Sequence, residues 1–207
     1  MALCCLKSDI STELGGRDVN IACLGWGSLI WKPDTLPLAG EWYSDGPEVP
    51  IEFSRVGDGG ELATAICLNA PSVQVYWALM AVDTLDQACA ALHEREQIPL
   101  ERQDGIGRLL TASASPTPQG VLTRWAQERK IDAVIWTALP PRYMDIEGRI
   151  PTEQDALAYL TSLSGETLQH ARSYIERVPA QIDTPYRRAF ERQMGWDLRG
   201  RTAASAV

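Results

Sequence analysis

The stretch formed by residues 19–31 limits what this chain can fold into more than any other. It is apolar apart from Asn20 and Ser28, and it contains two glycines. This pattern indicates a buried strand that runs into a tight turn of the backbone, and Lys32-Pro33-Asp34 ends the run. Residues 1–18 lack such periodicity, so we predict a flexible leader before the first strand.

Further strands are predicted after this one. Residues 51–56 and 62–68 are joined through Gly57-Asp58-Gly59-Gly60, whose Asp-Gly and Gly-Gly pairs supply the positive φ angles of a hairpin. Residues 73–82 are apolar on both faces, which favours a central strand or a barrel wall over an exposed sheet. A last strand is expected at residues 133–139.

Helices are predicted between and after these strands. Thr84 and Gln87 have the spacing of a capping box, which begins a helix that runs through Gln97 and stops before Pro99. Residues 103–118 are rich in Gly, Ser, Thr and Pro, and we expect an irregular loop there. Further helices are expected at residues 121–130, 152–162, 165–177 and 185–193. Because strands with one central helix come first and a helical cluster comes last, the fold class is α+β.

Composition and charge exclude several classes of function. The 207 residues include 19 basic and 27 acidic side chains, and the formal charge of −8 argues against a general nucleic-acid binder. No run approaches the roughly 18 apolar residues of a membrane span, and the apolar start of the chain is too short for a signal peptide, so we expect a cytoplasmic protein. Five cysteines without a Cys-x-x-Cys pair and only two histidines predict neither a disulfide framework nor a metal site.

The loop that follows the first strand is a candidate binding site. Bare glycines expose successive backbone N–H groups, and such a nest holds an anion such as a substrate carboxylate. A dinucleotide-binding loop is disfavoured because Ile30 stands where that fingerprint has Gly or Ala. A β-bulge whose glycines merely relieve crowding remains an equal alternative. The candidate residues are Gly25, Trp26, Gly27, Ser28 and Leu29.

Glu96 is the candidate catalytic residue. At about 100° per residue it falls within roughly 20° of Leu85 on the apolar stripe of its helix, whereas Glu94 falls about 180° away. Desolvation on that stripe raises the pKa of a carboxyl group toward neutrality, where it accepts and returns a proton at cellular pH. The alternative is that Glu96 pairs with an arginine such as Arg55 or Arg95.

Two further residues are candidates for substrate binding. Arg55 stands near the end of a predicted strand, where it either orients a substrate carboxylate beside Glu96 or is an ordinary strand-end charge. Tyr143 follows Pro140-Pro141-Arg142 and either closes the mouth of the pocket or packs on the surface as a loop aromatic. Both alternatives stay open for each residue.

These motifs together resemble the gamma-glutamylcyclotransferase-like superfamily, near its glutathione-specific branch and related uncharacterised bacterial members. There the opening strand ends in a Tyr-Gly-Ser-Leu or Tyr-Gly-Ser-Asn loop, which is similar to Trp26-Gly27-Ser28-Leu29. The catalytic glutamate of that superfamily follows an arginine on the helix after the hairpin strands, as Glu96 follows Arg95. The similarity covers residues 19–98. It implies a small mixed-strand β-barrel with helices packed outside, in one domain from residue 19 to 207, with residues 150–195 as a helical C-terminal part.

The resemblance also implies a reaction. The α-amine of a γ-glutamyl amine or peptide attacks its own γ-carbonyl, which closes 5-oxoproline and expels the attached amine. Glu96 is the implied general base and acid, and the loop from Gly25 to Leu29 anchors the substrate. No cofactor is expected, and the expected partner is this small molecule rather than a nucleic acid or a membrane.

Three departures from the superfamily pattern keep an alternative open. Trp26 replaces the loop tyrosine, Gln97-Ile98-Pro99 replaces a Lys-x-Gly-Tyr-like continuation, and the helical tail has only a loose counterpart. The alternative function is a binding or regulatory module that keeps the pocket for a small anionic metabolite or an acidic peptide. A third hypothesis is an interaction protein that works through its helical tail.

Overall fold

A computed structural model of the chain describes residues 19–111 and 120–198, and the predicted leader lies outside these residues. The first strand, β1 (Ile21–Gly25), is fully buried, as its uninterrupted apolar sequence predicts. It is the second strand of a four-stranded sheet with the order β5-β1-β7-β6. In this sheet β1 runs parallel to β7 (Ala133–Thr137), and the two outer strands, β5 (Tyr76–Leu79) and β6 (Ile106–Leu110), run antiparallel to their neighbours.

The predicted hairpin forms the centre of a second sheet. β2 (Glu48–Val56) pairs antiparallel with β3 (Leu62–Ile66), and Gly60 in the connecting turn has a φ of 81°. β2 also pairs with β8 (Arg142–Tyr143), which forms a small hairpin with β9 (Ile146–Glu147) that the sequence did not predict. The structure therefore confirms the α+β class with mixed sheets, and the strands curl into half of a barrel rather than one closed ring.

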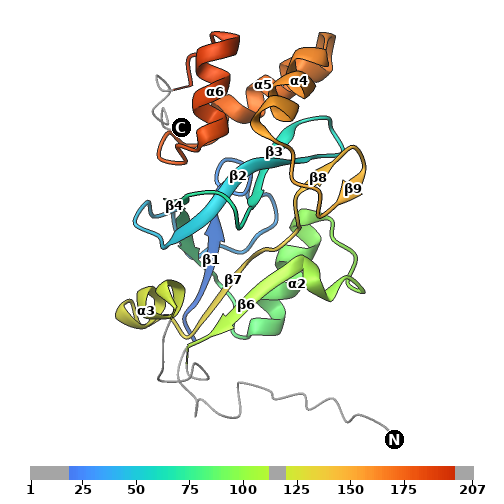
Figure 1. Cartoon of the computed structure of the whole chain (residues 1–207). Coiled ribbons are helices and arrows are strands. Elements are labelled where there is room, and N and C mark those ends of the chain that lie inside the picture. The colour runs from blue at the N-terminus through green and yellow to red at the C-terminus, as the bar shows by residue number, and fades with distance from the viewer. Residues whose placement is uncertain (1–18, 112–119, 199–207) are drawn as a thin grey trace, which may run out of the picture.

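The predicted strand at residues 73–82 is divided between the two sheets. Its first part, β4 (Ser72–Gln74), pairs with β2, and its second part, β5, pairs with β1. Val75 stands between the two parts, is fully buried, and donates its N–H to Pro47 O at 3.0 Å. The run is apolar on both faces because it crosses from one sheet to the other through the interior (Figure 1).

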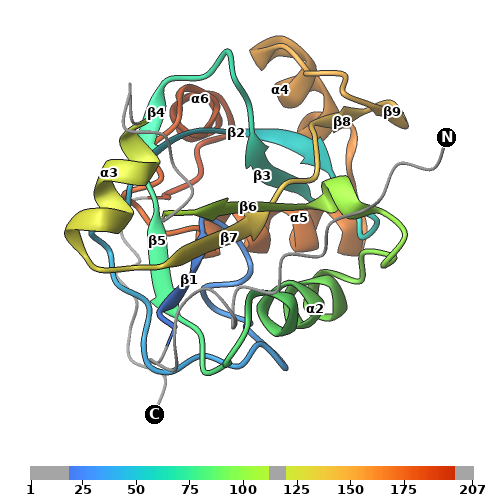
Figure 2. The same ribbon diagram turned by 90° about the horizontal axis from the view of Figure 1, so that it is seen from below.

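A helix with the predicted caps covers one side of the first sheet. Helix α2 (Leu85–Glu96) begins with a complete capping box between Thr84 and Gln87, and it ends at Gln97, whose φ is 54°. It lies along β6 and β7 (Figure 2), where Leu85 and Leu92 are buried. The face of α2 that carries Leu85 therefore packs on the sheet, as the apolar stripe predicts.

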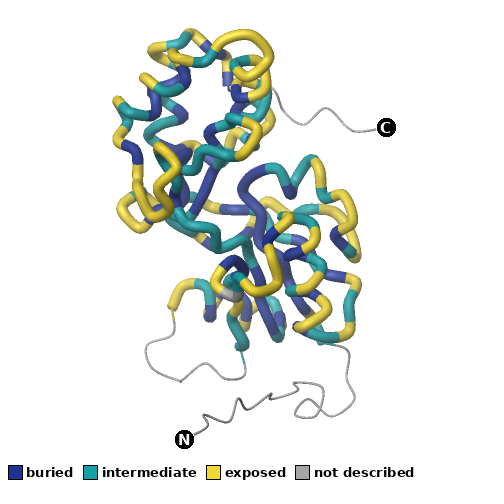
Figure 3. The backbone as a smooth tube through the Cα atoms, turned by 90° about the vertical axis from the view of Figure 1, so that its right-hand side faces the viewer, coloured by how far each residue is buried: buried dark blue, intermediate teal, exposed yellow. Residues whose placement is uncertain are grey.

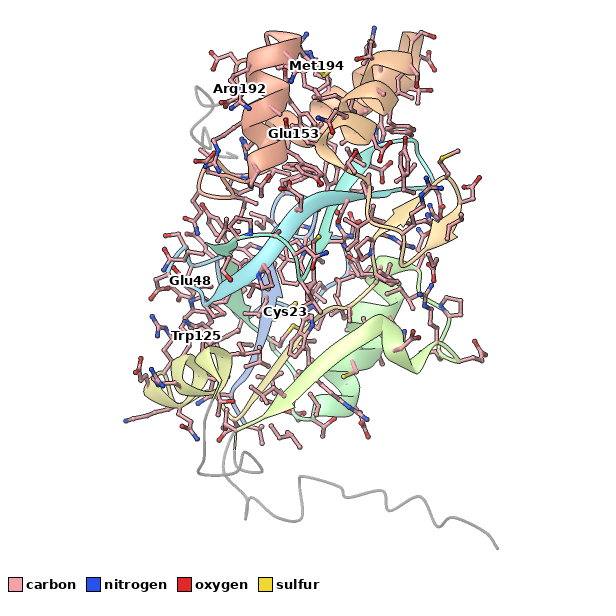
Figure 4. All side chains as sticks on the ribbon, viewed as in Figure 1. Cys23, Glu48, Trp125, Glu153, Arg192 and Met194 are labelled. Atoms are coloured by element: carbon pink, nitrogen blue, oxygen red, sulfur yellow. The ribbon has the colours of Figure 1, made fainter. Side chains whose placement is uncertain are left out.

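The C-terminal helices cover the second sheet. α4 (Glu153–Ser162), α5 (Gly165–Arg177) and α6 (Pro185–Met194) agree with the predicted helices, and they stack over β2 and β3 (Figure 1). In Figure 3 the outward turns of these helices are exposed, and the buried segments face the sheet. Phe190 packs edge-on against Phe53 of β2, with ring centroids 5.7 Å apart. Arg192 and Met194 lie at the outer end of α6, far from Cys23 in the centre of the molecule (Figure 4).

One segment differs clearly from its prediction. The structure has β6 within residues 103–118, where we expected an irregular loop, although residues 112–119 lie outside the described part. The strand is short and pairs only with β7, and the backbone of its Gly107 lies against the ring of Trp136. Its pairing partner, rather than its own composition, makes this segment a strand. Helix α3 (Val121–Glu128) follows at the predicted place.

Within the two described stretches, no helix has both the length and the apolar character needed to cross a membrane.

Candidate active site

A cavity of about 620 Å³ lies at the carboxyl ends of the parallel strands β1 and β7. The loop after β1, the β2–β3 hairpin, the last turn of α2 and one face of α5 form its walls. The carboxyl ends of parallel strands are a usual place for a ligand because the chain turns away from the sheet there. The volume also falls within the range of small-molecule sites, about 300–1,000 Å³.

The loop after β1 forms one wall of this cavity. Its turn is closed by hydrogen bonds from Ile30 N to Gly27 O at 3.1 Å and from Lys32 N to Ser28 O at 2.9 Å. The N–H groups of Gly27, Ser28 and Leu29 form no hydrogen bond with other described residues. These three donors, on a cavity wall, are the arrangement that binds an anionic or developing negative oxygen.

Both glycines of the loop are explained by close packing. A Cβ at Gly27 would lie 2.5 Å from the hydroxyl oxygen of Tyr174, and a Cβ at Gly25 would lie 2.6 Å from the ring of Trp42. Neither glycine is among those with a positive φ. Close packing therefore accounts for both glycines, and Gly27 also lines the cavity.

Arg95 joins the end of α2 to this loop. Its guanidinium donates to Ser28 Oγ at 3.1 Å and to Lys32 O at 2.6 Å, and its Nη1 lies 2.7 Å from Glu96 Oε1. The loop and the carboxyl group of Glu96 are thus attached to the same side chain. This shared partner holds Glu96 beside Ser28 on the cavity wall.

The helix-face prediction for Glu96 is confirmed. Its side chain is 16% exposed and lines the cavity, whereas Glu94 is exposed to solvent. Burial raises the pKa of Glu96, and the neighbouring Arg95 opposes that rise through its charge and its hydrogen bond. Glu96 therefore pairs with Arg95, the alternative that the sequence left open, and is also buried at a cavity. The net effect of the two is to raise its pKa.

The structure brings most of the predicted site residues together. Gly25 and Tyr143 are the exceptions. Gly25 lies behind the loop against Trp42, and the Tyr143 ring packs against Tyr159 while its hydroxyl donates to Asp155 O at 3.4 Å. Tyr143 is therefore held against α4 and does not close the cavity. The predicted residues that line the cavity are Trp26, Gly27, Ser28, Leu29, Arg55 and Glu96.

Arg55 lies on the cavity wall with its guanidinium already engaged. Its Nη1 donates to Pro140 O at 2.8 Å, and its Nη2 lies 3.2 Å from Glu147 Oε1. These contacts connect β2 to the segment that carries β8 and β9. Arg55 therefore anchors a strand and contributes positive charge to the cavity, and its orientation of a substrate carboxylate stays a prediction.

Helix α5 contributes a wall that the sequence analysis missed. Four polar residues of this helix face the cavity, and their spacing of three, four and seven residues puts them on one helix face. This polar stripe beside buried Ala171 and Ile175 was a visible signal, but nothing in the sequence showed that the helix reaches the loop after β1. The four residues are His170, Ser173, Tyr174 and Arg177.

The charged groups of the cavity favour an anionic ligand slightly. Lys32, Arg55, Arg95, Arg142 and Arg177 line it, against Asp34, Asp58, Glu61 and Glu96. Several of these groups are paired with each other, including Arg142 with Asp58 at 2.6 Å and Glu61 with His170 at 3.3 Å. A small positive excess stands out on a chain whose formal charge is −8.

Among the residues that the structure describes, no group of three or more His, Cys, Asp or Glu side chains is placed to hold a metal ion. Comparison of the chain with models of known families, with curated proteins and with solved structures finds no match. The function of the protein is therefore inferred from its own residues and from the geometry of the cavity.

Proposed function

We propose that this protein is a cyclotransferase that converts a γ-glutamyl amine or peptide into 5-oxoproline and the free amine. The observation that carries this proposal is the placement of Glu96, a half-buried carboxyl group with a raised pKa on the wall of a cavity. Gly27, Ser28 and Leu29, whose N–H groups form no hydrogen bond with other described residues, line the same cavity. The resemblance of the loop and helix motifs to the gamma-glutamylcyclotransferase-like superfamily supports the same reaction and a domain of that type.

The reaction needs three proton transfers and one attack. Glu96 takes a proton from the substrate α-ammonium, and the freed amine attacks the γ-carbonyl carbon to form a five-membered ring. The carbonyl oxygen becomes negative during this attack, and the loop amides stabilise it. The ring nitrogen gives its second proton to water, the C–N bond to the leaving amine breaks, and Glu96 returns its proton to the leaving nitrogen. The proton balance closes without a cofactor or a protein nucleophile, and we place this metabolite chemistry in the cytoplasm.

Arg95 has a supporting role in this scheme. Its guanidinium lies 2.7 Å from Glu96 Oε1 and 3.1 Å from Ser28 Oγ, so one side chain links the proposed base to the loop. Its positive charge also limits the rise in the pKa of Glu96. An upward shift of the pKa brings a carboxyl group closer to the range in which it both accepts and returns a proton.

The test is release of 5-oxoproline from a panel of γ-glutamyl amines, γ-glutamyl dipeptides and glutathione, measured by mass spectrometry. We expect turnover by the wild type and a kcat about 10²- to 10⁴-fold lower for Glu96→Gln, whose amide keeps the shape but transfers no proton. The matched control is Glu94→Gln, two residues away and exposed, which should retain full activity. Equal losses in both variants would contradict the proposal.

A non-catalytic binding module is the second candidate. It is favoured by the ion pair between Arg95 and Glu96, at 2.7 Å, and by the positive excess of the cavity lining. Such a module binds a small anionic metabolite without releasing 5-oxoproline. Calorimetric binding of the panel compounds with no turnover would select this candidate over the cyclotransferase.

A further inference from the structure

Tyr174 places a hydroxyl group on the cavity wall opposite the end of α2. It comes from α5, its ring packs edge-on against Trp31 with centroids 5.4 Å apart, and its oxygen lies 2.5 Å from the place where a Cβ of Gly27 would stand. The partner of this hydroxyl is Thr64 of β3, whose Oγ1 lies 3.1 Å from Tyr174 Oη and whose N–H donates to that oxygen at 3.4 Å.

The direction of these hydrogen bonds follows from counting protons. Thr64 Oγ1 has a single proton and donates it to Trp26 O at 3.2 Å, because a carbonyl oxygen only accepts. In the contact between Thr64 Oγ1 and Tyr174 Oη, the tyrosine must therefore be the donor. Tyr174 also accepts from Thr64 N–H, so its one proton is used and only an acceptor site remains.

Burial keeps the hydroxyl in this state. It raises the pKa of Tyr174 to about 12, with a smaller contribution from the charge of Glu96, so the phenol stays neutral and its proton stays directed to Thr64. The acceptors of the cavity lining thus include both the Glu96 carboxylate and Tyr174 Oη. A primary ammonium group has three N–H donors and no acceptor, which is the complement of this pair.

We infer that Tyr174 Oη accepts a hydrogen bond from the α-ammonium group of the substrate, and that this contact selects γ-glutamyl compounds with a free α-amine. The inference depends on the proposed function for the identity of the ligand. When Glu96 removes one proton, Tyr174 retains its bond to a remaining N–H of the amine. The nitrogen lone pair is then held away from Tyr174 and is free to attack the γ-carbonyl.

The test compares two ligands that differ only in the α-amine, γ-glutamylglycine and glutarylglycine. Their dissociation constants are measured by calorimetry in the full chain with Glu96→Gln, so that no ligand is consumed, with and without Tyr174→Phe. We expect Tyr174→Phe to raise the dissociation constant of γ-glutamylglycine by about 10-fold or more, the usual effect of losing a hydrogen bond to a charged group. The dissociation constant of glutarylglycine should change by less than about 2-fold.

The matched control is Tyr159→Phe, because Tyr159 donates to Gly60 O at 2.8 Å and does not line the cavity. It should leave both dissociation constants unchanged. If Tyr174→Phe weakens the binding of both ligands equally, Tyr174 has a structural role and the inference is overturned. The inference is also overturned if γ-glutamylglycine does not bind, or if Tyr174→Phe leaves its binding unchanged. If Tyr174→Phe weakens only the binding of γ-glutamylglycine but the wild type releases no 5-oxoproline, the proposed catalysis alone is overturned.

Discussion

At the scale of single residues, the site depends on side chains that leave room for one another. The hydroxyl of Tyr174 and Thr64 Oγ1 both lie within 3 Å of the place where a Cβ of residue 27 would stand. Glycine at this position is what allows Tyr174 of α5 and Thr64 of β3 to approach the loop. A loop residue is thus constrained by a helix residue far along the chain.

We therefore expect Gly27→Ala to lower the free energy of unfolding by about 1–3 kcal/mol, the usual cost of overpacking. Urea denaturation followed by tryptophan fluorescence measures this change. Gly40→Ala is the control, since no atom lies within 4 Å of a Cβ there. Adding Tyr174→Phe to Gly27→Ala should recover part of the loss, because it removes the nearest atom. Identical midpoints for the two alanine variants would show that the loop adapts without cost.

At the scale of elements, a buried carboxyl group joins the second sheet to α6. Glu52 of β2 is 2% exposed, and its oxygens accept from Thr184 Oγ1 at 2.5 Å and from Tyr186 N at 3.3 Å. Thr184 is the N-cap of α6, so Glu52 lies at the positive end of the helix dipole. Desolvation nevertheless dominates and raises the pKa of Glu52 to about 6.

This raised pKa makes stability depend on pH in a defined direction. Between the ordinary value of 4.5 and about 6, the folded state holds the proton of Glu52 more tightly than the unfolded state does. The stabilising contribution of protonated Glu52 to the folded state is therefore fully present below pH 4.5 and is lost as the pH rises through about 6. Its loss lowers the free energy of unfolding by about 2 kcal/mol.

Glu52→Gln removes this titration. As the pH rises from about 4 to about 7, the free energy of unfolding of the wild type should fall by about 2 kcal/mol relative to that of Glu52→Gln. Denaturant curves at a series of pH values measure it. Glu48→Gln, at the exposed end of the same strand (Figure 4), is the matched control. Parallel pH profiles for wild type and Glu52→Gln would contradict the assignment.

At the scale of the whole molecule, the C-terminal helices and the sheets share one core. A single cluster of buried residues joins Leu24 of β1, Phe53 of β2, Leu160 of α4, Ile175 of α5 and Phe190 of α6. The second, smaller cluster lies between α2 and the first sheet. The cavity stands where the loop, the hairpin and α5 meet, so its walls belong to parts of the chain that fold against each other.

We accordingly expect cooperative unfolding of the whole chain. Far-ultraviolet circular dichroism, which follows the helices, and tryptophan fluorescence, which follows residues such as Trp26 and Trp125 in the core, should give the same urea midpoint. Two separated transitions would mean that the helical cluster is stable apart from the sheets.

Much of the local structure was predictable because it depends on residues close together in the chain. The capping box at Thr84, the Gly-rich hairpin turn and the inward face of Glu96 follow from helix and strand periodicity alone. The division of residues 73–82 at Val75 was not predictable, because apolar residues on both faces fit one central strand as well as a strand that changes sheets.

The amino-acid sequence alone determined the helices and the β2–β3 hairpin, and which side of α2 carries the candidate base. Only the tertiary structure decided that Tyr174 stands over Gly27, that Arg95 attaches Glu96 to the loop, and that Tyr143 turns away. Helical and strand periods act within a few residues, whereas these contacts depend on how distant elements pack, and the free energy that selects that packing is shared among many buried side chains.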